Sequence, residues 1–98
     1  MKTQKPDTLC IHAGYTPKNG EPRVAPIVQS TTYVYESSQE MGALFDLQEE
    51  GFFYTRLGNP TLDVVEKKIA ALEGGVGAML TSSGQAASLM AVLNICPA

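Results

Sequence analysis

The sequence predicts the opening of an α/β domain with a parallel sheet, and three segments in its second half support this prediction. Residues 60–73 carry apolar side chains at helical spacing, residues 78–81 form a short apolar run, and residues 85–95 form a helical segment that is apolar almost all round. Helix, strand and helix in this order begin such a domain. Because a parallel sheet needs more than one strand, we expect further chain to complete it.

The first half of the chain predicts an irregular arm over residues 1–60. Five prolines interrupt it: Pro6, Pro17, Pro22, Pro26 and Pro60. Residues 27–35 are rich in β-branched and aromatic side chains, which favours extended backbone, but no hairpin partner lies nearby in the sequence. Residues 37–40, Ser-Ser-Gln-Glu, are a capping signal ahead of Met41 and Leu44, so a short helix is expected there.

The helix over residues 60–73 has clear start and stop signals. Asn59 can cap its N-terminus, and Pro60 suits the first helical turn. Gly74 and Gly75 are expected to end it. The run at 78–81 is then expected to be a short buried strand, and Ser82-Ser83-Gly84 a tight turn before the second helix.

Composition limits the classes of function. The 98 residues have a formal net charge of −3 and scattered cations, so nucleic acid is not an expected partner. Two distant cysteines make no disulfide framework and suit a reducing, cytoplasmic location. The start of the chain has no apolar core of a signal peptide, and no apolar run approaches the roughly 20 residues that cross a membrane, so no membrane contact is expected.

The turn around Gly84 is the first candidate site. A glycine at a helix start lets the backbone approach a ligand, and the first N–H groups together with the helix dipole favour an anion. Ser82 and Ser83 are possible hydroxyl donors. The pattern fits a phosphate cradle, but it fits an ordinary capping turn equally well.

The second candidate is the segment 53–61, which contains Tyr54 and Arg56. The Arg56 guanidinium can hold a phosphate or carboxylate in fork geometry. Tyr54 points the same way if the backbone between them is extended. A surface arginine beside a half-buried tyrosine is the alternative interpretation.

The remaining reactive side chains do not form a site. Cys10 and His12 are too few for a metal, so we interpret them as structural and expect no metal site. Ser83 lacks a His and Asp constellation for nucleophilic catalysis.

Five motifs in sequence order make the chain resemble the Cys/Met-metabolism (trans-sulfuration) family of pyridoxal-phosphate (PLP) enzymes. They lie at residues 8–14, 25–33, 54–61, 72–75 and 83–87. Gln85 stands where the lyase and cystathionine branches usually have Met, and residues 44–51 also look like the O-acetylhomoserine sulfhydrylase (homocysteine synthase) branch.

The resemblance implies a fold, a domain division and a cofactor site. The fold is the N-terminal part of a type I (aspartate-aminotransferase-like) PLP-dependent transferase. Residues 1–60 would be an arm on the neighbouring subunit, and residues 61–98 would begin the large PLP-binding domain. The cofactor is pyridoxal 5'-phosphate: Tyr54 and Arg56 would contact the phosphate of the adjacent protomer, and the N–H groups of Gly84 and Gln85 that of their own.

The resemblance also implies an activity for a longer enzyme. O-acetylhomoserine and sulfide would give homocysteine and acetate in a cytoplasmic homotetramer of methionine biosynthesis. Methionine γ-lyase or cystathionine synthase or lyase activity stays open as an alternative, as does a non-catalytic fragment that keeps only phosphate-binding or dimerisation elements. No lysine of this chain matches the Schiff-base lysine, which is expected beyond Ala98, so no catalytic residue is expected within these 98 residues and the chain alone is expected to be inactive.

Overall fold

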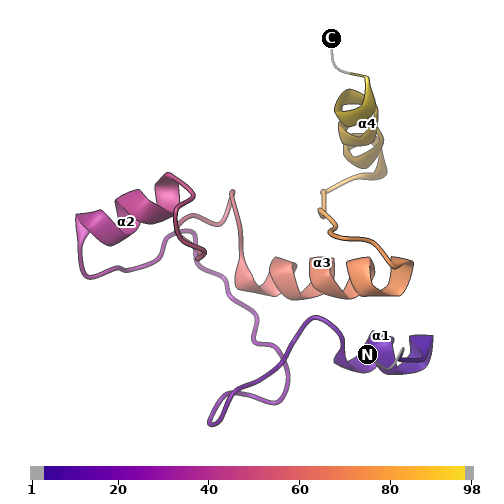
Figure 1. The fold of residues 1–98 in the computed structure, drawn as a ribbon, viewed down its shortest axis with the longest axis horizontal. Helices are drawn as coiled ribbons and strands as arrows, with labels where there is room; N and C mark the ends of the chain where they lie inside the picture. Colours follow the sequence, from indigo (N-terminus) through magenta and orange to yellow (C-terminus); the bar gives the residue numbers. More distant parts are fainter. Residues whose placement is uncertain (1–3, 97–98) are drawn as a thin grey trace.

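A computed structural model describes residues 4–96 as four helices joined by long connections (Figure 1). The helices are α1 (Pro6–His12), α2 (Ser38–Phe45), α3 (Pro60–Glu73) and α4 (Gly84–Ile95). Helix α1 lies along α3, and these are the only two helices in contact within the described range. Helices α2 and α4 stand away from this pair, so α3 is the centre on which the arm is assembled.

Helix α1 was not predicted, because the prolines favoured irregular backbone in this part of the arm. Pro6 occupies the start of α1, where a missing N–H costs nothing, and Asp7 lies in the first turn, where the helix dipole favours an acid. Gly14 follows the helix with φ +90°, and a Cβ there would collide with the carbonyl oxygen of Val64. This glycine therefore lets the chain turn directly against α3.

The two local capping predictions are confirmed. At α2, the Ser37 hydroxyl accepts from the N–H of Glu40 at 3.2 Å. At α3, the Asn59 side chain accepts from the N–H of Thr61 at 2.9 Å, and Gly74 ends the helix in the left-handed conformation with φ +67°. These ends are set by neighbouring residues, which is why the sequence predicts them well.

The expected strand over residues 78–81 is wrong for this chain. Residues 78–80 are exposed and none of the described residues pairs with them as a strand. The N–H of Leu80 instead donates to the Glu66 carboxylate at 2.8 Å. A strand requires a neighbouring backbone to bond, and residues 4–96 supply none at this position.

Helix α4 confirms the second helical prediction, but its apolar side chains are exposed rather than covered. Leu89 and Val92, for example, are each 58% exposed. The residues of α4 read as apolar all round, so this surface is typical of a helix that packs on several sides in a larger domain.

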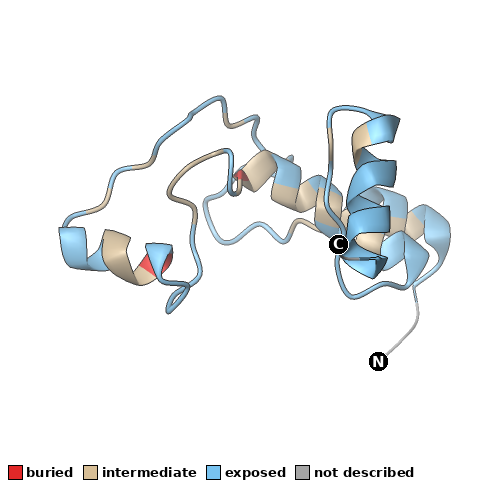
Figure 2. Ribbon diagram, turned by 90° about the horizontal axis from the view of Figure 1, so that it is seen from above, coloured by how far each residue is buried: buried red, intermediate tan, exposed pale blue. Residues whose placement is uncertain are grey.

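Buried positions are few. Leu44 on α2 and Asn59 before α3 are the only buried residues in the described range, shown in red in Figure 2. The accessible surface is 8509 Å², whereas a globular monomer of 10.5 kDa exposes about 5,400 Å². The radius of gyration, 15.9 Å, likewise exceeds the roughly 13 Å of a globular chain of this length. The arrangement is therefore held mainly by hydrogen bonds and not by an apolar core.

Candidate functional site

Tyr54 and Arg56 lie side by side on a turn. The N–H groups of Leu57 and Gly58 both donate to the Tyr54 carbonyl, at 3.0 and 3.1 Å. The guanidinium carbon of Arg56 lies 5.1 Å from the centroid of the Tyr54 ring. The condition of extended backbone is not met, since residues 55–57 form a turn, and the two side chains meet by stacking instead. Arg56 is exposed, so its guanidinium keeps donors available for an anion.

Residues 28–33 hold this turn from one side. Thr32 and Tyr54 form an antiparallel bridge, and the N–H of Thr55 donates to the Thr31 carbonyl at 2.8 Å. The Thr55 hydroxyl donates to the Ser30 carbonyl. The apolar and β-branched segment therefore does find a pairing partner, although a distant one that its local sequence does not reveal.

Asn59 is a buried junction that sequence reasoning identified only as a helix cap. It is 5% exposed, and its amide nitrogen lies 3.0 Å from the Val28 carbonyl, 3.3 Å from the Tyr33 hydroxyl and 3.3 Å from the Thr55 hydroxyl. Its carbonyl oxygen caps α3 at the same time. The signal that was available is chemical: an asparagine cap keeps two amide donors that an aspartate or serine cap lacks.

Thr61 ties the arm to α3 independently of the turn. Its hydroxyl donates to the Pro26 carbonyl at 2.9 Å and accepts from the N–H of Val28 at 2.8 Å. Both partners belong to the 25–33 motif. The start of α3 therefore fixes the arm at Val28 through two separate side chains.

The second candidate site is the N-terminus of α4. The Ser83 hydroxyl accepts from the N–H of Ala86 at 3.1 Å, and the Thr81 hydroxyl donates to the Ser83 carbonyl at 2.8 Å. Among the described residues, no acceptor bonds the N–H groups of Gly84 and Gln85. Both residues are exposed, and a Cβ added at Gly84 would meet no atom within 4 Å. Two backbone donors thus face open space at the positive end of the helix.

One chain does not bring the two candidate sites together. Arg56 precedes α3 and Gly84 follows it, and α4 rises from the far end of that helix (Figure 1). Within residues 4–96, α4 makes no contact with another helix. A single anion in this chain would therefore meet either the arginine fork or the helix N-terminus.

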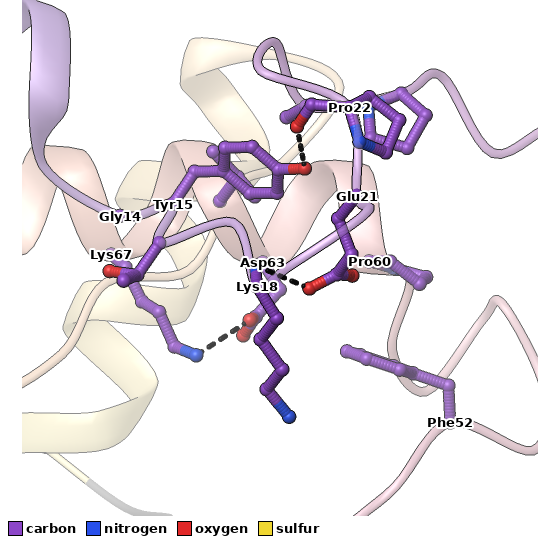
Figure 3. A pocket seen from close by; sticks show the side chains of 13 residues that line it. Gly14, Tyr15, Lys18, Glu21, Pro22, Phe52, Pro60, Asp63 and Lys67 are labelled. Carbon is purple, nitrogen blue, oxygen red and sulfur yellow. Dashed lines mark hydrogen bonds and ion pairs between the residues drawn. The ribbon is translucent and has the colours of Figure 1, made fainter.

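An open pocket lies between the chain after α1 and the side of α3 (Figure 3), and its volume is about 450 Å³. Three of its charged side chains, those of Glu21, Asp63 and Lys67, have partners within it. Lys67 and Asp63 form an ion pair at 2.8 Å, and the Glu21 carboxylate accepts from the N–H of Lys18 at 2.7 Å. The hydrogen bond and charge of Asp63 raise the pKa of Lys67. The pocket contains none of the four predicted site residues.

Other reactive groups lie apart from these sites. Cys10 and His12 are exposed on α1. Among residues 4–96, no three His, Cys, Asp or Glu side chains are grouped so as to hold a metal ion. No helix in that range is long and apolar enough to span a membrane.

Comparison with known proteins identifies relatives that are enzymes of sulfur amino-acid metabolism. The O-acetyl-L-homoserine sulfhydrylase of Leptospira meyeri is 50% identical over 95 residues, 96% of this chain and 22% of that protein. The L-methionine gamma-lyase of Fusobacterium nucleatum subsp. polymorphum is 52% identical over 81 residues, 82% of this chain and 20% of that protein. The chain thus spans about a fifth of the length of the curated relatives it matches.

A solved structure supports the same assignment. The O-acetylhomoserine (thiol)-lyase of Campylobacter jejuni, whose crystal structure contains N'-pyridoxyl-lysine-5'-monophosphate, superposes with a TM-score of 0.86 at 37% identity over 93% of this chain and 22% of that one. The expected fold, the N-terminal part of a type I PLP-dependent enzyme, is confirmed by this likeness. The family of Cys/Met metabolism PLP-dependent enzymes matches residues 7–98. The chain therefore belongs to the Cys/Met-metabolism family, whose cofactor is pyridoxal phosphate.

Proposed function

We propose that these residues are the N-terminal part of an O-acetylhomoserine sulfhydrylase, which converts O-acetylhomoserine and sulfide to homocysteine and acetate. The 50% identity to the Leptospira meyeri enzyme supports this reaction. Gln85 supports it further, because it resembles the sulfhydrylase branch at a position where the lyase branches usually have Met.

One observation carries the cofactor role of this chain: two sets of anion donors that do not meet within one chain. The N–H groups of Gly84 and Gln85 and the dipole of α4 would bind the phosphate of PLP. Arg56 and the Tyr54 hydroxyl would contact the phosphate held by a neighbouring subunit. The chemistry of both donor sets fits a phosphate, and their separation fits a site shared between two chains.

The same reasoning supports two regions of the chain with different roles. Residues 1–60 would form an arm on the neighbouring subunit, and residues 61–98 would begin the large PLP-binding domain. The exposed apolar residues of α4 are suited to contact that domain. We further propose a cytoplasmic homotetramer built from dimers with shared active sites.

The residues of this chain would hold and orient the cofactor. Bound PLP supplies an electron sink for the carbanion that forms on the substrate. The helix N-terminus and the arginine fork fix the phosphate end, which sets where the reactive ring lies relative to the substrate. Because no lysine here matches the family's attachment site, the 98 residues alone are expected to have no turnover.

The test is an assay of the full-length enzyme that carries these residues. Purified with PLP, it should form homocysteine from O-acetylhomoserine and sulfide, and much less 2-oxobutyrate from methionine. The same assay can be made on a chimera in which residues 1–98 replace the matching segment of the Leptospira meyeri enzyme. Loss of activity in that chimera, with a normal fold by circular dichroism, would contradict the proposal.

A second candidate is a methionine γ-lyase, favoured by the 52% identity to the Fusobacterium protein. Both activities use the same phosphate contacts, so the site residues do not separate them. Fast release of 2-oxobutyrate from methionine, with no dependence on sulfide, would select the lyase. Cystathionine formation or cleavage in the same assay would select the remaining branch of the family. PLP binding without any of these activities would instead support a non-catalytic protein.

A further inference from the structure

We propose that Asn59 is a positioning residue for the phosphate contact of Arg56, and this inference rests on the function proposed above. Asn59 is buried and only 5% exposed, so it would not touch the cofactor itself. It would act through the turn that presents Arg56. The proposal therefore assigns a role in cofactor binding to a residue that otherwise looks like a helix cap.

The first step is the placement of Asn59 relative to the turn. Arg56 lies between Thr55 and Asn59, and both of these residues bond to the same arm segment, 28–33. The Asn59 amide also lies 3.3 Å from the Thr55 hydroxyl, which links the two ends of the turn to each other. The turn is thus fixed at both ends while Arg56, near its tip, is exposed.

The second step is that the amide donors of Asn59 are separable from its cap. The carbonyl oxygen bonds the N–H of Thr61, whereas the amide nitrogen faces Val28, Tyr33 and Thr55. A serine can supply the cap oxygen but has no amide group. Asn59→Ser therefore removes the contact to the turn and retains a cap on α3.

The third step concerns the conformational entropy that Arg56 and its turn lose when an anion binds. An arginine side chain loses rotamer freedom when it binds, and a mobile backbone beneath it would add to that loss. Fixing the turn in advance reduces this cost, which strengthens binding without a new contact. The stacking of Arg56 on Tyr54 requires the same turn geometry.

The experiment is a double-mutant cycle in the full-length enzyme, read out as the PLP dissociation constant of the apoenzyme by absorbance titration. Asn59→Ser should weaken PLP binding about threefold to tenfold, the range of one net hydrogen bond. Combined with Arg56→Ala, it should add little further loss, because its effect passes through Arg56. Thr61→Val is the control, since it breaks a contact between α3 and the arm without touching the turn, and should leave PLP affinity within about twofold.

The outcomes separate this inference from the proposed function. If Arg56→Ala leaves PLP affinity unchanged, the proposed phosphate contact is wrong, and the inference is lost with it. If Arg56→Ala weakens PLP binding but Asn59→Ser does not, the positioning role alone is wrong. The positioning role is also wrong if the losses of PLP affinity caused by the two substitutions add fully in the double variant. Should Asn59→Ser fail to fold, Thr55→Val decides, because it removes the hydroxyl at the other end of the turn and should show the same lack of additivity.

Discussion

The Arg56 guanidinium stacks on the ring of Tyr54, 5.1 Å from its centroid, near the tip of a turn fixed to the arm by Thr55. The stack holds the planar group in place while its N–H donors stay exposed. An aromatic ring beneath a guanidinium contributes about 0.5–1 kcal/mol at exposed sites. Tyr54 therefore helps to orient Arg56.

Replacing Arg56 tests this surface directly. In the full-length enzyme, Arg56→Ala should weaken PLP retention by about 1.5–3 kcal/mol, the worth of a charge-assisted hydrogen bond. Arg23→Ala is a suitable control, since Arg23 is an exposed arginine of the arm that lies outside the turn. The rate of PLP loss on dialysis measures the difference. Equal loss from both variants would contradict the phosphate contact.

The cap of α4 offers a test by charge. Ser83→Asp should preserve the cap on Ala86, because aspartate caps as well as serine, but should place a negative charge beside the proposed phosphate. A helix N-terminus favours one negative charge, but two negative charges placed there repel each other. The repulsion between the Asp carboxylate and the phosphate should therefore weaken PLP binding by about tenfold or more.

Ser37→Asp is the control for that charge. Ser37 caps α2 with nearly the same backbone angles, φ −142° and ψ 155° against −153° and 156° at Ser83. Its variant should leave PLP affinity unchanged while α2 stays capped. A loss of affinity in both variants would point to a general effect of charge and against a phosphate at α4.

Local signals in the sequence predict the helix ends but not the contacts between distant segments. Ser37, Asn59 and Gly74 cap their helices through residues within four positions, so these capping roles follow from the sequence around them. The strand expected at 78–81 depends on neighbours that residues 4–96 do not include, so its apolar character alone was misleading. A segment's preference for strand structure is realised only where a neighbouring strand pairs with it.

The candidate site also combines features set by neighbouring residues with features set by distant contacts. The helix N-terminus at Gly84 is a local feature, and the structure has it as the sequence predicts, with two N–H groups that no described residue accepts. The Tyr54–Arg56 turn is a product of pairing with Thr31 and Thr32, more than twenty positions away, so alternation along a strand was the wrong geometry. The amide of Asn59 bonds across a similar separation, which hid its second role.

Gly14 should be the least replaceable glycine of the arm. An added Cβ would collide with the Val64 carbonyl oxygen and lie 3.1 Å from the Lys68 nitrogen, and φ is +90°. Gly14→Ala should therefore destabilise the full-length enzyme by more than the ~1–2 kcal/mol of a left-handed alanine, since α1 must move off α3.

Gly20→Ala separates the two causes of that loss. Gly20 has a similar φ of +86°, but a Cβ there meets no atom within 4 Å. Its variant should show the conformational cost alone. Thermal unfolding of both variants at one protein concentration gives the comparison, and equal shifts in Tm would show that the close approach to α3 contributes nothing.

The surface of the chain leads to a prediction for the isolated 98 residues. The accessible area of 8509 Å² exceeds the globular expectation of about 5,400 Å² by more than half, and Leu44 is the only buried apolar side chain in the described range. Such a chain has too little apolar burial to offset the entropy of ordering it. On its own it should unfold without a cooperative thermal transition, bind a hydrophobic dye such as ANS, and acquire no stabilisation from PLP. A sharp transition that shifts upward with PLP would show that the arm and the start of the large domain fold together without the rest of the enzyme, and would favour a stand-alone binding role over the proposed sulfhydrylase.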